Sequence, residues 1–209
     1  MKLTIQKPEL FTIVDNLSKN TSFGGNQAWY HKSWNQKSGC GPTCAANITA
    51  YLAHTRKGYE KLYKSSSMEK SDFLQHMNDL FEYITPGPMG VNTIDKFLIG
   101  ARKFAEDRGV QLEMKALSVD KSTKKLRSRE ELVNFLEEAF HKDAPIAFLN
   151  LSVGEETRLQ NWHWITITEV EIWDDTIMAI ASDEGDLRVF DLLLWYQTTK
   201  MHGGLIYFA

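Results

Sequence analysis

Cys40 lies in the segment Ser-Gly-Cys-Gly-Pro-Thr-Cys and has the surroundings of a reactive thiol. Pro42 and the alanine-rich stretch after it predict a helix that starts here, which places Cys40 at the helix N-terminus. The partial positive charge of a helix N-terminus favours the thiolate, which is the nucleophilic form of cysteine. Gly39 and Gly41 predict a tight turn that presents the side chain. We therefore expect Cys40 to be a nucleophile and Cys44, one helical turn further on, to be a packed core residue.

A cysteine nucleophile needs a general base, and one of the six histidines is well placed to act as one. His163 begins a strand with the sequence Trp-His-Trp-Ile-Thr-Ile, in which the two tryptophans exclude water from the imidazole. The other five lie in a loop, in a turn, or on the predicted solvent side of helices: His31, His202, His54, His76 and His141. His163 is therefore the candidate base.

The imidazole also needs a third group that fixes its tautomer. The strand after His163 turns back near residues 173–175, and the return strand ends in Ala-Ser-Asp-Glu-Gly-Asp. A loop of residues 173–175 pairs Ile165 with Asp183 and places Asp183 diagonal to His163 on one face of the sheet. A loop with an even number of residues brings Asp186 opposite His163 instead. We favour Asp183 as the orienting carboxylate, with Asp186 as the alternative.

These side chains must be positioned by a helical first half and a strand-rich second half. Apolar residues recur at helical spacing in three further segments: 70–84, 91–108 and 128–142. In the last of them, Ser128 and Glu131 have the spacing of a capping box. Residues 20–39 show no period and predict an ordered loop packed by its aromatic residues. After Pro145 the pattern changes to strands, so the order predicts an α+β fold with an antiparallel sheet.

The 209 residues suffice for one sizeable core, and we expect a single domain over residues 1–209. Lys and Arg number 24 and Asp and Glu number 27, so the net charge of −3 implies no polyanionic partner. One basic segment could bind nucleic acid; its residues are Lys121, Lys124, Lys125, Arg127 and Arg129. It has no aromatic residue and adjoins an acidic helix, so we interpret it as a solvated loop and expect no nucleic-acid partner.

The chain also suggests where the protein resides. Lys7, Glu9 and Asp15 interrupt the first apolar stretch, so we expect no secretory leader. No apolar run approaches the roughly 20 residues that cross a bilayer, and we expect no membrane partner. Two cysteines so close in sequence exclude a disulfide framework. We therefore expect a cytoplasmic protein with reduced thiols.

Together these motifs resemble a known family. The order of Cys-Gly-Pro-Thr at a helix start, a His-Trp-Ile-Thr-Ile-Thr strand and an aspartate ending the next strand is similar to the papain-like cysteine peptidases. The closest likeness is to the branch that contains the double-glycine, bacteriocin-leader peptidases, and it spans residues 34 to 192. The resemblance implies a helical half with the nucleophile Cys40 at the start of a central helix. It also implies a C-terminal antiparallel sheet that carries His163 as general base and acid and Asp183 as orienting residue.

The resemblance further implies an oxyanion hole. Family members carry a glutamine shortly before the cysteine, and its amide donates to the oxyanion beside the backbone N–H of the cysteine. Gln36 is the matching residue and the donor that we expect, although it is closer to Cys40 than is usual in the family. The alternatives are that Asn35 takes this place or that the hole is incomplete. The leader peptidases are usually fused to an export transporter, and this chain shows no membrane segment. The identity of the substrate therefore does not carry over.

We expect a hydrolase of peptide or amide bonds that works through a Cys-His-Asp triad and a thioester intermediate, without a cofactor. Acyl transfer to an amine uses the same groups, and an inactive binding module is a further alternative; the oligomeric state stays open. A metal site could take its four ligands from Cys40, Cys44, His163 and Asp183. Zinc sites of this kind usually show a second close pair of Cys or His, and the sequence has none, so we expect no metal.

Overall fold

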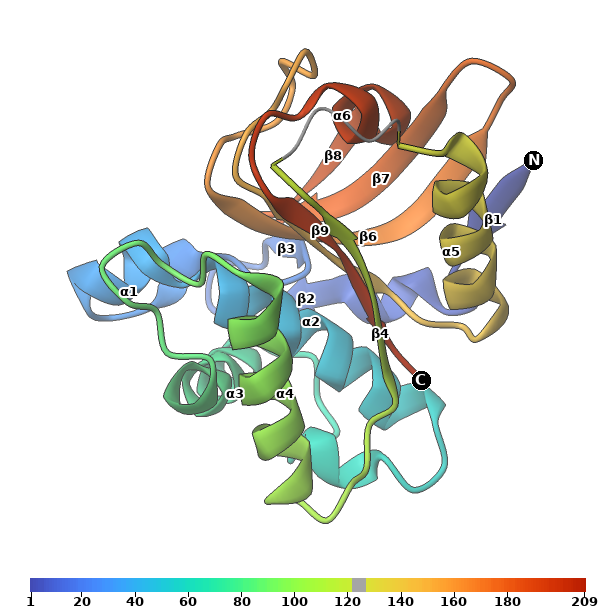
Figure 1. Cartoon of the computed structure of the whole chain (residues 1–209). Coiled ribbons are helices and arrows are strands. Elements are labelled where there is room, and N and C mark those ends of the chain that lie inside the picture. The colour runs from blue at the N-terminus through green and yellow to red at the C-terminus, as the bar shows by residue number, and fades with distance from the viewer. Residues whose placement is uncertain (122–126) are drawn as a thin grey trace.

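The computed structural model describes residues 1–121 and 127–209, so Lys124 and Lys125 of the basic segment lie outside the described residues. The α-helices are α1 (Ser33–Ser38), α2 (Cys40–Thr55), α3 (Lys70–Tyr83), α4 (Ile94–Glu106), α5 (Arg129–His141) and α6 (Leu192–Thr198). Short 3₁₀ helices are η1 (Pro8–Phe11), η2 (Gln27–Trp29) and η3 (Glu60–Leu62). Helices α1 to α4 form one half of the molecule, and the sheet with α5 and α6 forms the other (Figure 1).

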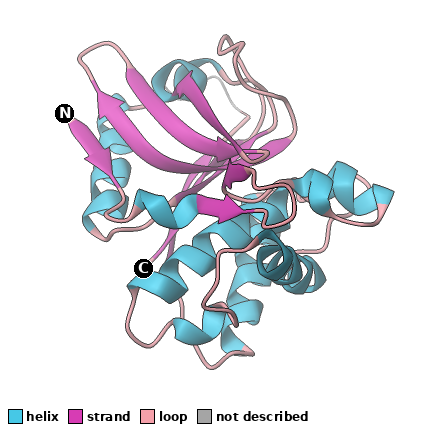
Figure 2. Cartoon of the chain, turned by 180° about the vertical axis from the view of Figure 1, so that it is seen from behind, coloured by secondary structure: helices cyan, strands magenta, loops and turns pink. Residues whose placement is uncertain are grey.

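The strands are β1 (Lys2–Thr4), β2 (Thr12–Val14), β3 (Thr21–Phe23), β4 (Met114–Val119), β5 (Ile146–Asn150), β6 (His163–Ile172), β7 (Ile177–Asp183), β8 (Asp186–Asp191) and β9 (Gly203–Phe208). The main sheet has the order β4-β9-β5-β6-β7-β8, and β1 pairs with β6. All of these pairs are antiparallel. Seen from behind, the same division into a sheet half and a helical half is plain (Figure 2). The predicted α+β class with an antiparallel sheet is confirmed.

The three predicted amphipathic helices form as α3, α4 and α5, and Ser128 Oγ accepts the Glu131 backbone N–H at 3.4 Å at the start of α5. The predicted loop over residues 20–39 is wrong in part, because it contains β3, η2 and α1. Strand β4 and helix α6 were not predicted. Strand β4 lies at the sheet edge and exposes several side chains, which weakens its alternation. Helix α6 follows β8 directly, and its apolar start resembles a continuing strand.

Helix α2 is the centre of the molecule. Every residue from 41 to 53 is buried, since α2 packs against both α3 and β6. Its buried surface is mostly apolar, and buried polar residues such as Asn47 have hydrogen-bond partners. The small residues Ala45, Ala46 and Ala50 allow its neighbours to approach closely. Cys40 is the first residue of this buried helix.

Strands β6 and β7 pair in a register that differs in part from the predicted one. Ile172 pairs with Ile177, so the loop has four residues, 173–176, and the predicted loop of residues 173–175 is wrong. A β-bulge between Ile167 and Glu169 then shifts the pairing by one residue, so that Thr166 pairs with Ser182. The bulge therefore restores, at the far end of the hairpin, the register that places Asp183 diagonal to His163.

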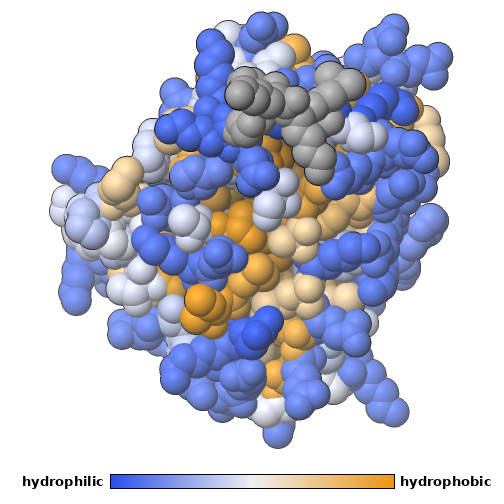
Figure 3. All heavy atoms as spheres, viewed as in Figure 1, coloured by the Kyte–Doolittle hydropathy of each residue, from blue (hydrophilic) through white to orange (hydrophobic). Residues whose placement is uncertain are grey.

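The bulge also marks a change of neighbour along β6. Residues 163–167 of β6 pair with β5, whereas residues 169–171 pair with β1. In the space-filling view, apolar atoms gather across the middle of the face shown in Figure 1, and hydrophilic residues surround them (Figure 3). Among the residues that the structure describes, no helix combines the length and apolar character needed to cross a membrane.

Candidate active site

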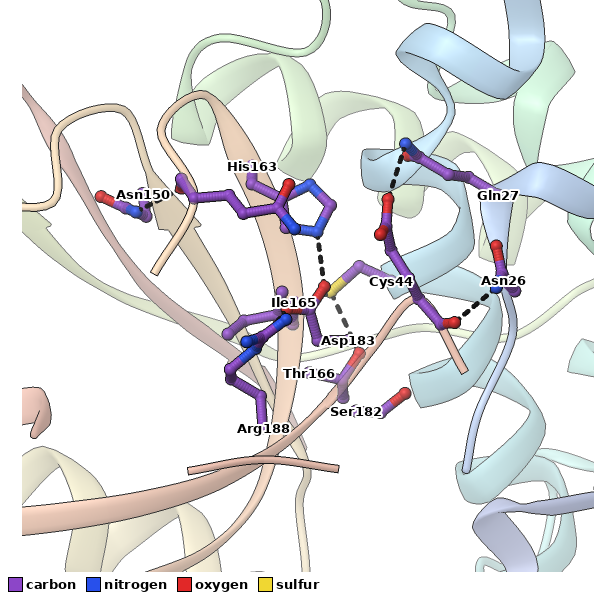
Figure 4. Close-up of polar contacts among 12 residues, drawn as sticks. Asn26, Gln27, Cys44, Asn150, His163, Ile165, Thr166, Ser182, Asp183 and Arg188 are labelled. Atoms are coloured by element: carbon purple, nitrogen blue, oxygen red, sulfur yellow. Dashed lines mark hydrogen bonds and ion pairs between the residues drawn. The ribbon is translucent and has the colours of Figure 1, made fainter. Parts of the chain in front are cut away.

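Three chain segments bring the predicted chemical groups together. Cys40 is the first residue of α2, His163 the first residue of β6 and Asp183 the last residue of β7. His163 Nε2 lies 2.7 Å from Asp183 Oδ1, and both residues are buried. Figure 4 shows the ring of His163 directed at the Asp183 carboxylate. Asp186, the alternative, is exposed on the far side of the β7–β8 turn and pairs with Asp183 only as a strand neighbour.

The second nitrogen of the His163 ring is available to Cys40. Nε2 is engaged by Asp183, so Nδ1 is the ring atom left to face the thiol. Burial lowers the pKa of His163, but the hydrogen bond with Asp183, the negative charge of that carboxylate and the nearby Cys40 outweigh it. The net result is a pKa well above the usual value, so the imidazolium is favoured. Nucleophilic cysteine chemistry requires a thiol next to a histidine that is readily protonated.

Asp183 stays ionised although it is buried. Burial raises the pKa of this carboxyl, but hydrogen bonds and positive charge from His163 and Arg188 bring the pKa below its usual value. Arg188 Nε donates to Asp183 Oδ2 at 2.9 Å, so each carboxylate oxygen has its own partner. Arg188 was not identified in the sequence, because its contact depends on the tight turn between β7 and β8.

The two cysteines differ as their positions in the helix predict. Cys44 is buried, its Sγ donates to the Ile165 carbonyl at 3.2 Å, and Thr166 Oγ1 donates to the sulfur at 3.3 Å. Burial raises the pKa of Cys44 to about 12, which keeps the thiol protonated. Cys40 is partly exposed, and both thiols are free. Cys44 is a packed core residue, as expected from its place one turn inside α2.

The glycines beside Cys40 serve a different purpose from the predicted one. A Cβ atom on Gly39 would lie 2.4 Å from the Tyr30 ring, and one on Gly41 would lie 3.0 Å from the Val91 side chain. Neither glycine has a positive φ, so the chain uses their small size and not their backbone freedom. They let the start of α2 sit tightly between two neighbouring segments, which fixes where the Cys40 side chain emerges.

The expectation for Gln36 needs correction. Its amide Nε2 donates to the Ala28 carbonyl at 3.2 Å and to the Tyr30 carbonyl at 2.7 Å. Both amide hydrogens are thus used to hold the segment before α1, and Gln36 lines neither of the two hollows at Cys40. The physical reason is that Gln36 lies on α1 itself and its side chain is directed back to the carbonyls of the preceding segment. Asn35, the alternative donor, lines neither hollow either.

Gln27 holds the position that Gln36 was expected to fill. It lines a small cavity together with Cys40 and His163. Its Nε2 donates to Glu184 Oε1 at 3.3 Å, and its buried Oε1 has no partner among the described residues. Figure 4 shows Gln27 reaching from the helical half toward the sheet residues. The spacing to Cys40 could not reveal it, but the preceding Gly-Gly pair is a signal of close backbone approach.

A buried polar network fixes the backbone in front of Gln27. Asn47 of α2 accepts the Gly25 N–H at 2.8 Å and donates to Thr166 at 3.1 Å and to Ser182 at 3.3 Å. Gly24 has a φ of 77°, and a Cβ atom there would lie 2.1 Å from Ser182 Oγ. The helix, both strands and the glutamine-bearing segment are therefore held in one arrangement.

An apolar cleft opens on the other side of Cys40. It has a volume of about 370 Å³, and its apolar wall includes Trp34, Met89, Val91, Leu149, Trp162 and Trp164. Trp164 Nε1 donates to the Val91 carbonyl at 2.6 Å, which ties the segment before α4 to β6. Trp162 precedes His163 with a φ of 59°, a strained conformation for a bulky residue. Lys37 adds a positive charge at the edge.

Comparisons with known proteins add little to this geometry. No protein-family model and no curated protein sequence matches the chain. Among solved structures, the crystal structure of the Pseudomonas avirulence protein AvrPphB is similar, with 10% identity and a TM-score of 0.37. The match covers 85% of this chain and 95% of that chain. Similarity this low transfers no residue role to this chain.

Within residues 1–121 and 127–209, no group of three or more His, Cys, Asp or Glu side chains is arranged to hold a metal ion.

Proposed function

We propose that the protein is a papain-like cysteine hydrolase that cleaves peptide or amide bonds through Cys40, His163 and Asp183. The observation that carries the proposal is the 2.7 Å contact between His163 Nε2 and Asp183 Oδ1, which leaves Nδ1 for the thiol at the start of α2. Membership of the double-glycine branch stays a prediction from the Cys-Gly-Pro and His-Trp motifs.

The first step is attack on the scissile carbonyl. Cys40 Sγ, as thiolate beside the His163 imidazolium, forms a bond to the carbonyl carbon, and the electron pair of the C=O bond moves to oxygen. The tetrahedral intermediate then expels the amine, which takes the proton from His163 Nδ1. A thioester on Cys40 and a neutral imidazole remain. Asp183 holds the ring in the tautomer and orientation that make this transfer possible.

The oxyanion needs donors that are in place before the reaction. The backbone N–H of Cys40 at the N-terminus of α2 and the side-chain amide of Gln27 are the donors we propose. Glu184 currently accepts from that amide, so substrate has to displace a hydrogen bond at an exposed carboxylate. This exchange costs little, because such a partner is readily replaced by water.

The second step releases the acyl group. A water molecule attacks the thioester carbon and gives its proton to His163, and collapse of the intermediate expels the Cys40 thiolate and frees a carboxylic acid. The imidazolium and thiolate pair is thereby restored, so atoms and charges balance over the cycle without a cofactor.

The apolar cleft supports a role in binding. Its tryptophan and aliphatic wall lies directly beside Cys40, so a large apolar group next to the scissile bond would lose its water shell there. We propose that substrates carry an aromatic or long aliphatic side chain close to the bond that is cut.

A substrate panel tests the proposed reaction. Peptides and simple amides with and without a large apolar side chain near the scissile bond are incubated with wild-type protein and with the Cys40→Ala variant. We expect cleavage only by the wild type, with nearly equal melting temperatures, because a partly exposed thiol contributes little packing. Equal turnover by Cys40→Ala would contradict the proposal.

Alkylation tests the proposed pair without a known substrate. At pH 6, iodoacetamide should label Cys40 much faster than Cys44, because Cys44 is buried and protonated. The His163→Ala variant should slow labelling of Cys40 and leave Cys44 unchanged, as read by mass spectrometry of the two positions. Labelling of Cys40 that does not respond to His163→Ala would show that the pair is not assembled.

A further inference from the structure

Asp183 is held from two sides. Its Oδ1 contacts His163 Nε2 at 2.7 Å, and its Oδ2 accepts the Arg188 Nε–H at 2.9 Å. The side chain of Asp183 is 3% exposed and that of Arg188 is 38% exposed, so the carboxylate is enclosed and the guanidinium reaches it from the surface. Figure 4 shows Arg188 lying against Asp183 beside the His163 contact.

The hairpin between β7 and β8 fixes this contact. Glu184 and Gly185 form a two-residue turn with φ values of 51° and 85°, and Asp183 pairs with Asp186 across it. Arg188 lies two residues beyond Asp186 and therefore on the same face of the sheet, diagonal to Asp183. A turn with two left-handed residues matches the twist of the strands, so the spacing between the two side chains is set by the backbone.

A guanidinium suits this task because it cannot lose its proton at physiological pH. It compensates the charge of an enclosed carboxylate and occupies one oxygen with a directional N–H. The carboxylate cannot rotate without breaking one of its two charged contacts. Its Oδ1 is consequently kept toward His163.

We propose that Arg188 is a positioning residue, which keeps Asp183 ionised and oriented toward His163 and thereby supports the Cys40 and His163 pair without contacting substrate. This inference rests on the proposed function, since it assigns Arg188 a role in the same site.

The other charged groups around Asp183 cannot stabilise its carboxylate as Arg188 does. His163 from β6 and Cys40 from α2 form the pair to be supported. Glu184 follows Asp183 in the turn and is engaged with Gln27, and Asp186 is exposed at the start of β8. Both add negative charge, so they do not stabilise the carboxylate. Among the described residues, Asp183 forms ion pairs with the His163 ring and with the Arg188 guanidinium.

A second arginine provides a matched control. Arg158 Nε donates to Glu156 Oε1 at 2.8 Å, and the Glu156 side chain is 2% exposed. Glu156 also accepts the Asp191 backbone N–H at 2.7 Å, so this carboxylate ties a loop to the end of β8. Arg158 and Glu156 line neither hollow at Cys40. Losing Arg158 therefore removes an arginine from a buried carboxylate without touching the proposed site.

The experiment measures alkylation of Cys40 by iodoacetamide between pH 5 and 8 in wild type, Arg188→Gln, Arg188→Lys, Arg158→Gln and His163→Ala, with thermal unfolding of each. We expect Arg188→Gln to slow labelling at pH 6 about tenfold, the size of one charged hydrogen bond at a partly exposed site. Arg188→Lys should recover part of the rate because it keeps the charge, and Arg158→Gln should label like wild type.

The outcomes separate the two proposals. Slowing by His163→Ala together with a wild-type rate for Arg188→Gln overturns the role of Arg188 and leaves the proposed function standing. No slowing by His163→Ala overturns both. Equal slowing by Arg188→Gln and Arg158→Gln also overturns the role, because it reports general destabilisation. If Arg188→Gln does not fold, Arg188→Lys decides the matter: a slowing of about threefold supports the role, and a wild-type rate overturns it.

Discussion

Two buried histidines, one in each half of the molecule, have opposite surroundings. His163 at the edge of the sheet half is 8% exposed and contacts Asp183. His76 on α3 in the helical half is 5% exposed, its Nε2 lies 2.8 Å from Thr49 Oγ1, and aromatic rings such as Phe104 surround it. The same residue type is thus equally enclosed in both halves, with a carboxylate partner in one and a hydroxyl in the other.

The partner decides what the ring does. Burial lowers the pKa of both histidines, and for His76 it lowers the pKa to about 3, with the positive charge of Arg108 adding to the effect. At His163 the contacts with Asp183 and Cys40 reverse the direction. His76 is therefore a neutral core residue, whereas His163 can hold and release a proton. Burial alone does not indicate chemistry; burial beside a charged partner does.

The largest expected effect separates the two rings by turnover. His163→Ala removes the proposed base and should lower kcat about 10⁴-fold with any cleaved substrate. His76→Gln should leave kcat close to wild type and lower the melting temperature, because it disturbs only core packing and the contact with Thr49. Steady-state rates and thermal unfolding of both variants check this. Comparable loss of kcat in the two variants would break the comparison.

The same contrast applies to the two glutamines before Cys40. Gln27→Ala should lower kcat about 10²–10³-fold with a smaller change in KM, because it removes the proposed oxyanion donor. Gln36→Ala should have a minor effect on kcat, since its amide holds only the Ala28 and Tyr30 carbonyls. Steady-state kinetics of the pair decide between them. A larger loss in Gln36→Ala would restore the assignment of Gln36 that the family resemblance implied.

A third expected effect concerns stability in acid. The unfolded chain protonates His76 near its usual pKa of 6.5, and the folded chain does so only near 3, so the unfolded state binds more protons between these values. The free energy of unfolding should thus fall as pH falls, by about 2 kcal/mol at pH 5 from this group. That corresponds to a drop in melting temperature of about 4–8 °C.

His76→Gln is the control, since it should flatten this acid slope. His163 has the opposite sign. Its contribution is fully present below pH 6.5 and is lost as pH rises toward its folded pKa of about 10. His163→Ala should therefore change the alkaline side of the stability curve. Melting temperatures of the three proteins across pH 4 to 10 check both directions, and an unchanged acid slope in His76→Gln would contradict the assignment.

The smallest expected effect uses two exposed tryptophans. Trp34 lines the apolar cleft and is 50% exposed, while Trp173 lies in the β6–β7 loop and is 58% exposed. Trp34→Ala should raise KM about three- to tenfold through lost apolar contact, with little change in kcat. Trp173→Ala should leave both constants unchanged. Equal effects would show that the cleft does not bind substrate.

The positions of the residues that lie at the ends of helices and strands could be predicted from the sequence. Cys40 follows from its helix start, and His163 from its strand start beside two tryptophans. The placement of Asp183 agrees with the expectation although the expected loop is wrong, because the bulge after Ile167 compensates for the extra loop residue. A compensation of this kind has no signature in local spacing.

The remaining site residues depend on contacts between distant segments. Gln27 reaches Cys40 around an intervening helix, and Arg188 reaches Asp183 across a turn, so spacing along the chain is uninformative. His76 could have been placed correctly. It lies three residues after Phe73 and four before Leu80, on the apolar face of α3, so its burial follows from helical periodicity alone.

The bulge in β6 divides one continuous strand into two segments that can open independently. The part next to the site is bordered by β5, and the part toward the hairpin tip is bordered by the N-terminal strand β1. Because hydrogen bonding is irregular at the junction, fraying of β1 and the hairpin tip should stop there. Amides of residues 169–172 should accordingly exchange with deuterium sooner than those of 163–167. The chain can thus tolerate local opening, or a change in loop length, at one end of the hairpin without moving the groups at the other.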